Sequence, residues 1–120
     1  MLPEQYRLKK RTAFAATYRS GTSYHKHGVT VFCGKLKQEG YINPTKIGFV
    51  VSKKIHKRAV KRNKIRRLMR EAVRLYIKNA GGIFDTKYIS LIFVATTTLL
   101  EKDYNYINKS INELMGMIND

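Results

Sequence analysis

The strongest constraint on the fold is the segment 58–80, where apolar side chains recur at the 3.6-residue period of an α-helix. Two glycines follow at once, Gly81 and Gly82, which is typical of a helix end. A stripe of this kind has to be buried, so the pattern predicts a long helix packed against a sheet. Its members are Ile65, Leu68, Met69, Ala72, Val73, Tyr76 and Ala80.

The first turns of this predicted helix carry cations where a core-facing helix would carry apolar residues. Extended backwards, the stripe reaches Arg62, Lys61 and Arg58. Cations at the N-terminal end of a helix oppose its dipole, at a cost of about 0.3–1 kcal/mol each. Stability alone does not favour this arrangement, whereas a phosphate ligand would offset the cost by ion pairing and counterion release. A merely solvated basic helix would explain cations on the outer face but not on the stripe.

The charge of the whole chain is concentrated in the same region. The 120 residues include 24 Lys and Arg against 8 Asp and Glu, a net charge of +16. Residues 53–74 alone contribute +10, because Glu71 is the only acidic residue among eleven basic ones. A solubilising surface would spread its charge more evenly. A focused basic stripe on a folded domain indicates a polyanionic partner, most often a nucleic acid.

The remaining patterns predict a single α+β domain over residues 1–120, with helices against a four-stranded sheet. Residues 38–44, which contain Gly40, Asn43 and Pro44, predict a hairpin-type connection between two of the strands. The strand over 88–96 is mainly apolar and β-branched, so we expect it to be central and covered on both faces. In chain order the elements are a helix from a cap at Thr12 to about Ser20, an edge strand over 23–27, strands around 29–33 and over 46–52, the long helix, the strand over 88–96 and a helix capped by Asp103.

Several classes of protein are disfavoured by what the sequence contains. Cys33 is the only cysteine and lies at a core-facing strand position, so no internal disulfide is expected. The first residues carry no apolar signal core, and the run 89–95 is too short to span a bilayer, so we expect a soluble cytoplasmic protein. The three histidines lack the partners of a metal site, and no catalytic motif is evident, so we expect neither a metal site nor a catalytic residue in the protein.

A resemblance to a known family rests on the residues around the basic helix. The stretches Ser52-Lys53-Lys54-Ile55 and 59–71, whose centre is Arg62-Asn63-Lys64, resemble the signature of the bacterial ribonuclease P protein component. That family has Arg-Asn-Arg at the centre, so Lys64 is a departure that keeps the charge but loses the bidentate fork of arginine. The resemblance continues upstream through Arg7-Leu8-Lys9-Lys10, Phe14, Tyr18 and Gly21-Thr22-Ser23.

The resemblance implies a fold, a set of partners and a division of labour. The element order would be α-β-β-β-α-β-α, a sandwich with a left-handed β-α-β crossover like that of the second domain of ribosomal protein S5. The partners would be ribonuclease P RNA and precursor tRNA, with no membrane and no obligate protein partner. The chemistry would belong to the RNA, which would hold Mg²⁺, and the protein would carry no cofactor. Residues expected to bind the catalytic RNA are Lys53, Lys57, Arg58, Lys61, Arg62, Asn63, Lys64, Arg66, Arg67, Arg70 and Arg74.

A second site is indicated by Phe32, which lies on the opposite side of its strand from Val29, Val31 and Cys33. Phe14 and Tyr18, four residues apart, share one face of the first helix. These rings either stack on a single-stranded nucleic acid or simply pack the helix onto the sheet. The resemblance favours contact with the 5′ leader of precursor tRNA, and the expected residues are Phe14, Tyr18, Thr30, Phe32, Val50, Ser52 and Lys54, the last three on the strand taken to neighbour that of Phe32.

Two other classes of function remain as alternatives. A structural ribosomal protein would share the size and charge but would not require an aromatic groove beside Arg62-Asn63-Lys64. A protein nuclease would need acidic metal ligands. Only Glu71 lies among the basic residues, and we expect it to pair within its helix with Arg67 or Arg74.

Overall fold

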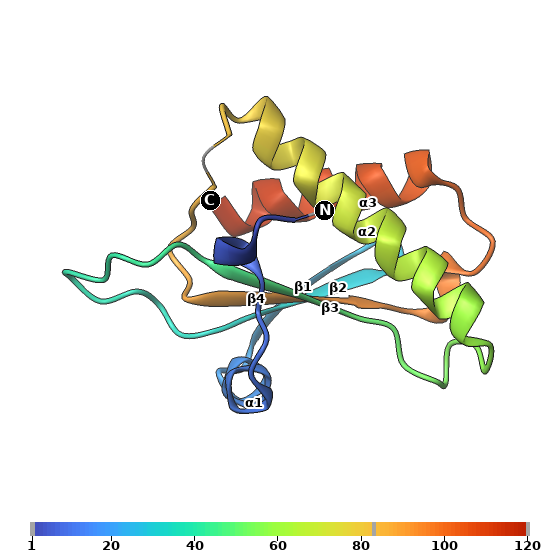
Figure 1. Cartoon of the computed structure of the whole chain (residues 1–120), viewed down its shortest axis with the longest axis horizontal. Helices are drawn as coiled ribbons and strands as arrows, with labels where there is room; N and C mark the ends of the chain where they lie inside the picture. Colours follow the sequence, from blue (N-terminus) through green and yellow to red (C-terminus); the bar gives the residue numbers. More distant parts are fainter. Residues whose placement is uncertain (1, 83, 120) are drawn as a thin grey trace.

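The computed structural model describes residues 2–82 and 84–119 and has the expected order of helices and strands (Figure 1). A short 3₁₀ turn precedes the first helix, and another follows the last strand. The elements are η1 (Glu4–Tyr6), α1 (Arg11–Arg19), β1 (Thr22–Lys26), β2 (Val29–Cys33), β3 (Lys46–Val50), α2 (Ala59–Asn79), β4 (Ser90–Ala95), η2 (Thr97–Leu99) and α3 (Tyr104–Asn119).

The four strands form one sheet in the order β1-β2-β4-β3. β4 runs antiparallel to β2 and parallel to β3, and nearly all its side chains are buried, as its mainly apolar sequence predicted. The chain passes from β3 through α2 to β4, the left-handed crossover that the resemblance implied. The hairpin expected at residues 38–44 is wrong, because β4 lies between β2 and β3. The segment 34–45 instead runs past the start of β4, where Leu36 pairs with Tyr88.

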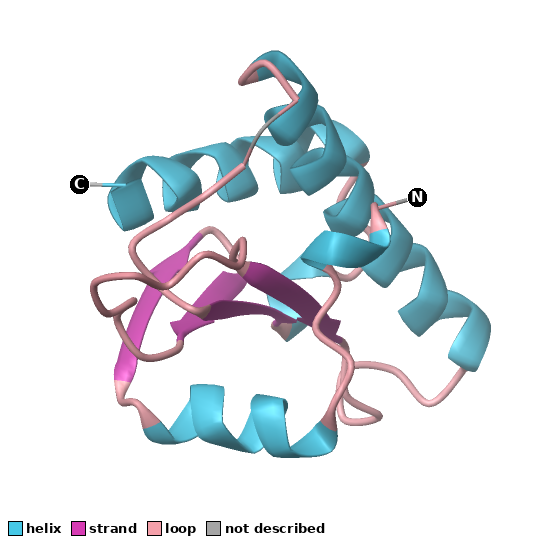
Figure 2. Ribbon diagram, turned by 60° about the vertical axis from the view of Figure 1, so that its left-hand side comes forward, coloured by secondary structure: helices cyan, strands magenta, loops and turns pink. Residues whose placement is uncertain are grey.

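The sheet is covered by different helices on its two faces (Figures 1 and 2). α2 and α3 cover one face and enclose the main core, to which the strands contribute Val31, Leu91 and Phe93. The shorter α1 crosses the other face, where Ile92 is fully buried. Since α1 has only nine residues, it covers this second face only in part.

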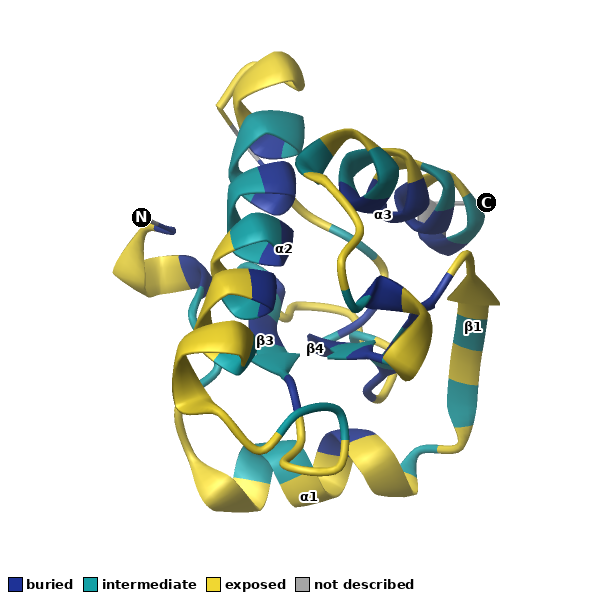
Figure 3. Cartoon of the chain, turned by 90° about the vertical axis from the view of Figure 1, so that its right-hand side faces the viewer, coloured by how far each residue is buried: buried dark blue, intermediate teal, exposed yellow. Residues whose placement is uncertain are grey.

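α2 packs through its C-terminal two-thirds and leaves its first turns exposed, as Figure 3 shows. The predicted stripe is confirmed from Ile65 onwards, with one correction at its end. Ala80 is exposed at the C-cap, and the buried position is Ile77. The helix stops at Asn79, so a residue one turn earlier completes its apolar face. Residues 59–64 are exposed apart from the half-buried Arg62.

One of the two predicted helix caps is present. The Asp103 carboxylate accepts a hydrogen bond from the Tyr106 N–H at 3.0 Å and caps α3. The cap expected at Thr12 is wrong, because α1 begins at Arg11 and Thr12 lies inside it. The N-cap is Lys10, whose carbonyl accepts from the N–H groups of Ala13 and Phe14 and which makes no side-chain cap.

The N-terminal segment protects the outer edge of the sheet, which the sequence did not reveal. Arg7 pairs with Ile47 of β3 in parallel, and the Leu8 N–H donates to the Ile47 carbonyl at 2.9 Å. Leu2 and Tyr6 are buried beside them. An exposed β-strand edge is a site of unwanted pairing, and this segment covers it.

Candidate nucleic-acid interface

The exposed part of α2 gathers cations onto one surface, the basic face, defined by Asn63, Lys64, Arg66, Arg67 and Arg70. With the exposed Val60, these residues line a shallow depression of about 490 Å³. Arg66 Nη1 donates to Asn63 Oδ1 at 2.6 Å, and the Arg70 guanidinium lies 6.0 Å from the centre of the Phe49 ring. These contacts hold two of the guanidinium groups before any ligand arrives.

Arg62 has a different place from the one expected. Its Nη1 donates to the backbone carbonyls of His56 and Lys57, both at 2.8 Å. The side chain therefore fastens the loop 51–58 to the start of α2, where the sequence pattern indicated a core-facing cation. Lys53, Lys57 and Arg58 are exposed on this loop and at the N-cap, next to the basic face in sequence.

Two other residues expected to bind the catalytic RNA, Lys61 and Arg74, do not line the depression of the basic face. Lys61 lines a second hollow with Lys102 and the apolar Leu68 and Leu99, and Lys64 lines both hollows. Arg74 is half-buried and donates from Nε to Glu71 Oε2 at 3.0 Å, so the in-helix pair is with Arg74 rather than Arg67.

The ion pair between Glu71 and Arg74 explains why an acidic residue is tolerated beside so many cations. The hydrogen bond from Arg74 lowers the pKa of the Glu71 carboxyl, more than burial raises it, and the Arg74 charge adds to the effect. Glu71 is thereby neutralised by Arg74, and neither residue lines the depression.

The second expected site is the part of the sheet that α1 leaves uncovered, here called the open sheet face. Across the strands, Thr30 of β2 lies beside Val94 of β4, and Val94 lies beside Val50 of β3. The rings of Tyr18 and Phe32 meet edge to face, with centroids 5.0 Å apart, and Tyr18 is 40% exposed.

Phe14 belongs mainly to the packing of α1 on the sheet. A Cβ added to Gly48 would lie 2.6 Å from Phe14 Cζ, so the ring rests on the backbone of β3 where a side chain is missing. Of the two interpretations left open by the sequence, packing accounts for much of Phe14, while Tyr18 keeps an exposed ring surface. Loss of the Phe14 ring should therefore destabilise the fold more than loss of the Tyr18 ring.

The expected route of the site along β3 needs correction. β3 is not the neighbour of β2, because β4 separates them, and β3 ends at Val50. Ser52 and Lys54 consequently lie at exposed positions of the loop 51–58 rather than on the sheet. Val94 completes the row instead, because β4 lies between β2 and β3 and Val94 pairs with both Thr30 and Val50.

His25 is a further member of this face that sequence reasoning missed. It lies on the edge strand β1, opposite Thr30, and its Nδ1 is 2.7 Å from Thr30 Oγ1. The alternation of residues 22–26 would have placed it on the same side as Ser23, but nothing in the sequence fixed which side of the sheet that is.

Among the described residues, side chains that bind metals do not cluster at either surface. In residues 2–82 and 84–119 no three His, Cys, Asp or Glu side chains lie close enough together to hold a metal ion. Cys33 is buried, and burial raises the pKa of its thiol to about 11. Within the same residues, no helix has the length and apolar character needed to cross a membrane.

The strand order, the crossover helix and the basic face together define a small α+β protein with the electrostatic character of nucleic-acid-binding domains. The family model described as Ribonuclease P matches residues 2–119, so this chain belongs to the ribonuclease P protein family.

Relatives and solved structures agree with this membership. The ribonuclease P protein component of Symbiobacterium thermophilum is 42% identical over 114 residues, 94% of this chain and 90% of that protein. The one from Clostridium kluyveri is 33% identical over 113 residues, 92% of this chain and 91% of that protein. The solved RNase P protein of Staphylococcus aureus is 27% identical and superposes with a TM-score of 0.72, covering 99% of this chain and 94% of that one.

Proposed function

We propose that this chain is the protein subunit of a bacterial ribonuclease P, which binds the catalytic RNA and the 5′ leader of precursor tRNA and promotes removal of that leader. The observation that carries the proposal is the basic face, presented by a helix that overhangs the sheet, in a chain whose relatives are named ribonuclease P protein components. The enzyme is an endoribonuclease in which the RNA performs the chemistry.

The basic face supports binding of the catalytic RNA. Lys64, Arg66, Arg67 and Arg70 present four positive charges around one depression. Each contact with a phosphate releases condensed counterions, which supplies affinity without reading sequence. Lys64 provides a point charge where the family has a fork, so we assign the directional contacts to the arginines.

The open sheet face supports binding of the leader. Tyr18 offers an exposed ring beside Phe32, and cations of the loop 51–58 follow β3 in the chain. Aromatic stacking combined with backbone electrostatics holds single strands with little sequence preference. A leader that differs between precursor tRNAs requires this kind of recognition.

The proposal assigns no catalytic residue, metal or other cofactor to the protein. Mg²⁺ enters through the RNA subunit. The partners are ribonuclease P RNA and precursor tRNA in the cytoplasm, without an obligate protein partner and without a membrane. The rival function, a structural ribosomal protein, predicts that the chain purifies with ribosomal subunits rather than with one large RNA and precursor tRNA.

Reconstitution tests the proposal. The protein is added to a bacterial ribonuclease P RNA, and cleavage of precursor tRNA is measured at a low magnesium concentration, where the RNA alone is slow. We expect cleavage at the mature 5′ end to accelerate. A matched variant with Arg66, Arg67 and Arg70 changed to Gln should fold but fail to stimulate. Equal cleavage with and without the wild-type protein would refute the proposal.

A further inference from the structure

A third hollow lies against α1, on the flank opposite Phe14 and Tyr18. At 100° per residue, Ala13 and Ala16 project to one side of α1 and Phe14 and Tyr18 to the other, with the buried Thr17 between them facing the sheet. The hollow measures about 420 Å³, within the roughly 300–1,000 Å³ typical of ligand pockets. It is lined by Glu4, Arg7, Leu8, Lys9, Lys10, Ala13, Ala16, Tyr41, Lys46, Ile89 and Ser90.

The lining combines positive charge with apolar surface. Four of its residues are cationic, and its one acidic residue, Glu4, is paired with Lys9. The two alanines provide a wall without long side chains, so the space beside the helix stays open. Tyr41, which is 38% exposed, contributes an aromatic ring. Cations next to an exposed ring on an apolar floor match a nucleotide, which carries a phosphate and a flat base.

The wall that carries Tyr41 is held in place by hydrogen bonds. The Tyr41 N–H donates to the Gln38 carbonyl at 3.0 Å across a turn in which Gly40 has φ +87°, a conformation that favours glycine. After the turn, on the limb that leads into β3, the buried Thr45 Oγ1 donates to the Tyr88 carbonyl at 2.7 Å. The ring is therefore supplied by a structured turn and not by a free loop.

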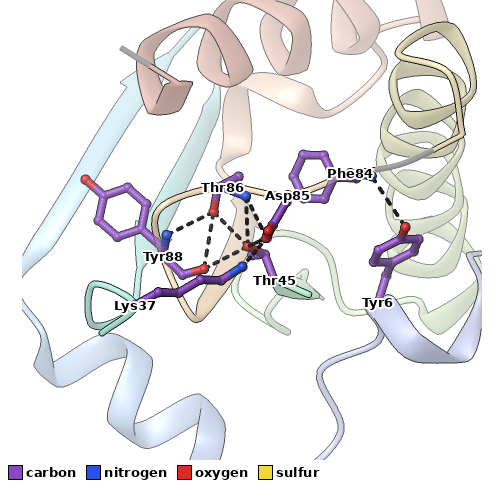
Figure 4. A network of polar contacts seen from close by, with 7 residues as sticks. All are labelled: Tyr6, Lys37, Thr45, Phe84, Asp85, Thr86 and Tyr88. Carbon is purple, nitrogen blue, oxygen red and sulfur yellow. Dashed lines mark hydrogen bonds and ion pairs between the residues drawn. The ribbon is translucent and has the colours of Figure 1, made fainter. Parts of the chain in front are cut away.

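A polar network ties this limb to the segment before β4 (Figure 4). Lys37 is ion-paired with Asp85, and Thr45 Oγ1 lies 2.8 Å from Thr86 Oγ1. Burial raises the pKa of Asp85, but the hydrogen bonds from Lys37, the Thr86 N–H and Thr45 outweigh it and the pKa falls below its usual value. The carboxylate thus stays charged at neutral pH and the two limbs stay joined.

We propose that this hollow binds one unpaired nucleotide of an RNA strand, with the base against Tyr41 and the phosphate among Arg7, Lys10 and Lys46. It is a third RNA contact, separated from the open sheet face by the width of α1 and distinct from the basic face. Two RNA strands present an unpaired base and a phosphate of this kind: the leader of the substrate and a single-stranded segment of the catalytic RNA.

Binding of a short single-stranded RNA to the purified protein tests the site. The probe is a fluorescent six-nucleotide RNA followed by anisotropy, with a photoreactive uridine for cross-linking. Ala16→Phe fills the hollow, and its matched control, Ala15→Phe, adds the same ring to an exposed position of α1 that does not line it. We expect A16F and Tyr41→Ala to weaken binding by about 5- to 150-fold, the range for the removal of one stacked base. A15F should bind like the wild type.

Two further measurements separate the site from general attraction to a basic protein. Lys46→Gln should reduce the slope of log affinity against log salt by about 0.7, as expected for one phosphate contact on a single strand. In the wild type, mass spectrometry should find Tyr41 among the cross-linked residues. Equal affinity of A16F and A15F, both verified as folded by thermal melting, would overturn the proposal, as would the absence of cross-links to Tyr41.

The source of the strand is identified in the reconstituted enzyme. Photoreactive nucleotides are placed either in the leader or in single-stranded segments of the catalytic RNA, and the arm that labels Tyr41 names the source. Tyr18→Ala should leave this labelling intact, because Tyr18 lies on the other flank of α1. If Tyr41 is labelled but Tyr18→Ala does not weaken leader binding, the leader site on the open sheet face is refuted and the hollow beside α1 is supported. Labelling in neither arm would overturn the assignment to the enzyme's RNA.

Discussion

Tyr18→Ala is the substitution that best separates leader binding from folding. Its ring is 40% exposed and meets Phe32 edge to face at 5.0 Å. An aromatic pair of this kind contributes about 0.5–1.5 kcal/mol beyond area burial, so the loss of stability should be small. If the ring stacks on the leader, its removal should cost about 1–3 kcal/mol of precursor tRNA binding, or roughly 5- to 150-fold in affinity.

Phe14→Ala serves as the contrasting variant. The Phe14 ring packs on Gly48, so its truncation should destabilise the fold by up to the ~3–5 kcal/mol of a buried phenylalanine. The assay compares the reconstituted enzyme's affinity for precursor tRNA with that for mature tRNA, alongside thermal melting. For Tyr18→Ala we expect a loss confined to the leader-bearing RNA at a nearly unchanged melting temperature. Equal losses for both RNAs would refute the assignment of the open sheet face to the leader.

Three further predictions concern the basic face, the packing of α1 and the core. Changing Arg66, Arg67 and Arg70 together to Gln should lower the salt slope of catalytic-RNA binding by roughly 0.7–0.9 for each phosphate that the variant no longer binds; an unchanged slope in a salt titration would place the interface elsewhere. Gly48→Ala should displace Phe14 and destabilise the protein by about 1–3 kcal/mol in urea unfolding, and it should be rescued by Phe14→Leu. The buried Cys33 thiol, with its pKa raised to about 11, should resist a thiol reagent until the chain unfolds, and rapid labelling under native conditions would contradict this. Because the folded state holds the thiol proton more tightly than the unfolded state, the free energy of unfolding should fall as pH rises from about 9 towards 11.

The sequence predicted the elements better than it predicted their arrangement. The period of α2, the mainly apolar β4 and the cap at Asp103 each follow from local chemistry, and all three are confirmed. The order β1-β2-β4-β3 is not local, since β4 enters between two strands that precede it in the chain. Nothing in residues 38–44 distinguishes a hairpin from a connection that leaves room for a later strand.

The same limit applies to the candidate sites. The cations of the basic face follow from helical spacing, but which of the other expected RNA-binding cations bond within the protein does not. Arg62 donates to two loop carbonyls and Arg74 to Glu71, partners that depend on the loop conformation and on rotamers. The hollow beside Ala13 and Ala16 was also beyond prediction, because Tyr41 and Lys46 reach it only through the loop that passes β4.

The position of Arg62 links the fold to the proposed function. A cation at the start of α2 is unfavourable against the helix dipole, yet Arg62 directs its charge to the carbonyls of His56 and Lys57 and so fixes the loop that carries Lys53, Lys54 and Lys57. Arg62→Gln should therefore release the loop as well as remove a charge. Hydrogen exchange should show faster exchange at the Ile55 N–H, which donates to the Ser52 carbonyl at 3.1 Å, while Arg67→Gln, a matched loss of one charge, should leave that exchange rate unchanged. If both variants weaken RNA binding alike and neither alters exchange in residues 52–58, Arg62 acts by its charge alone and the anchoring role is wrong.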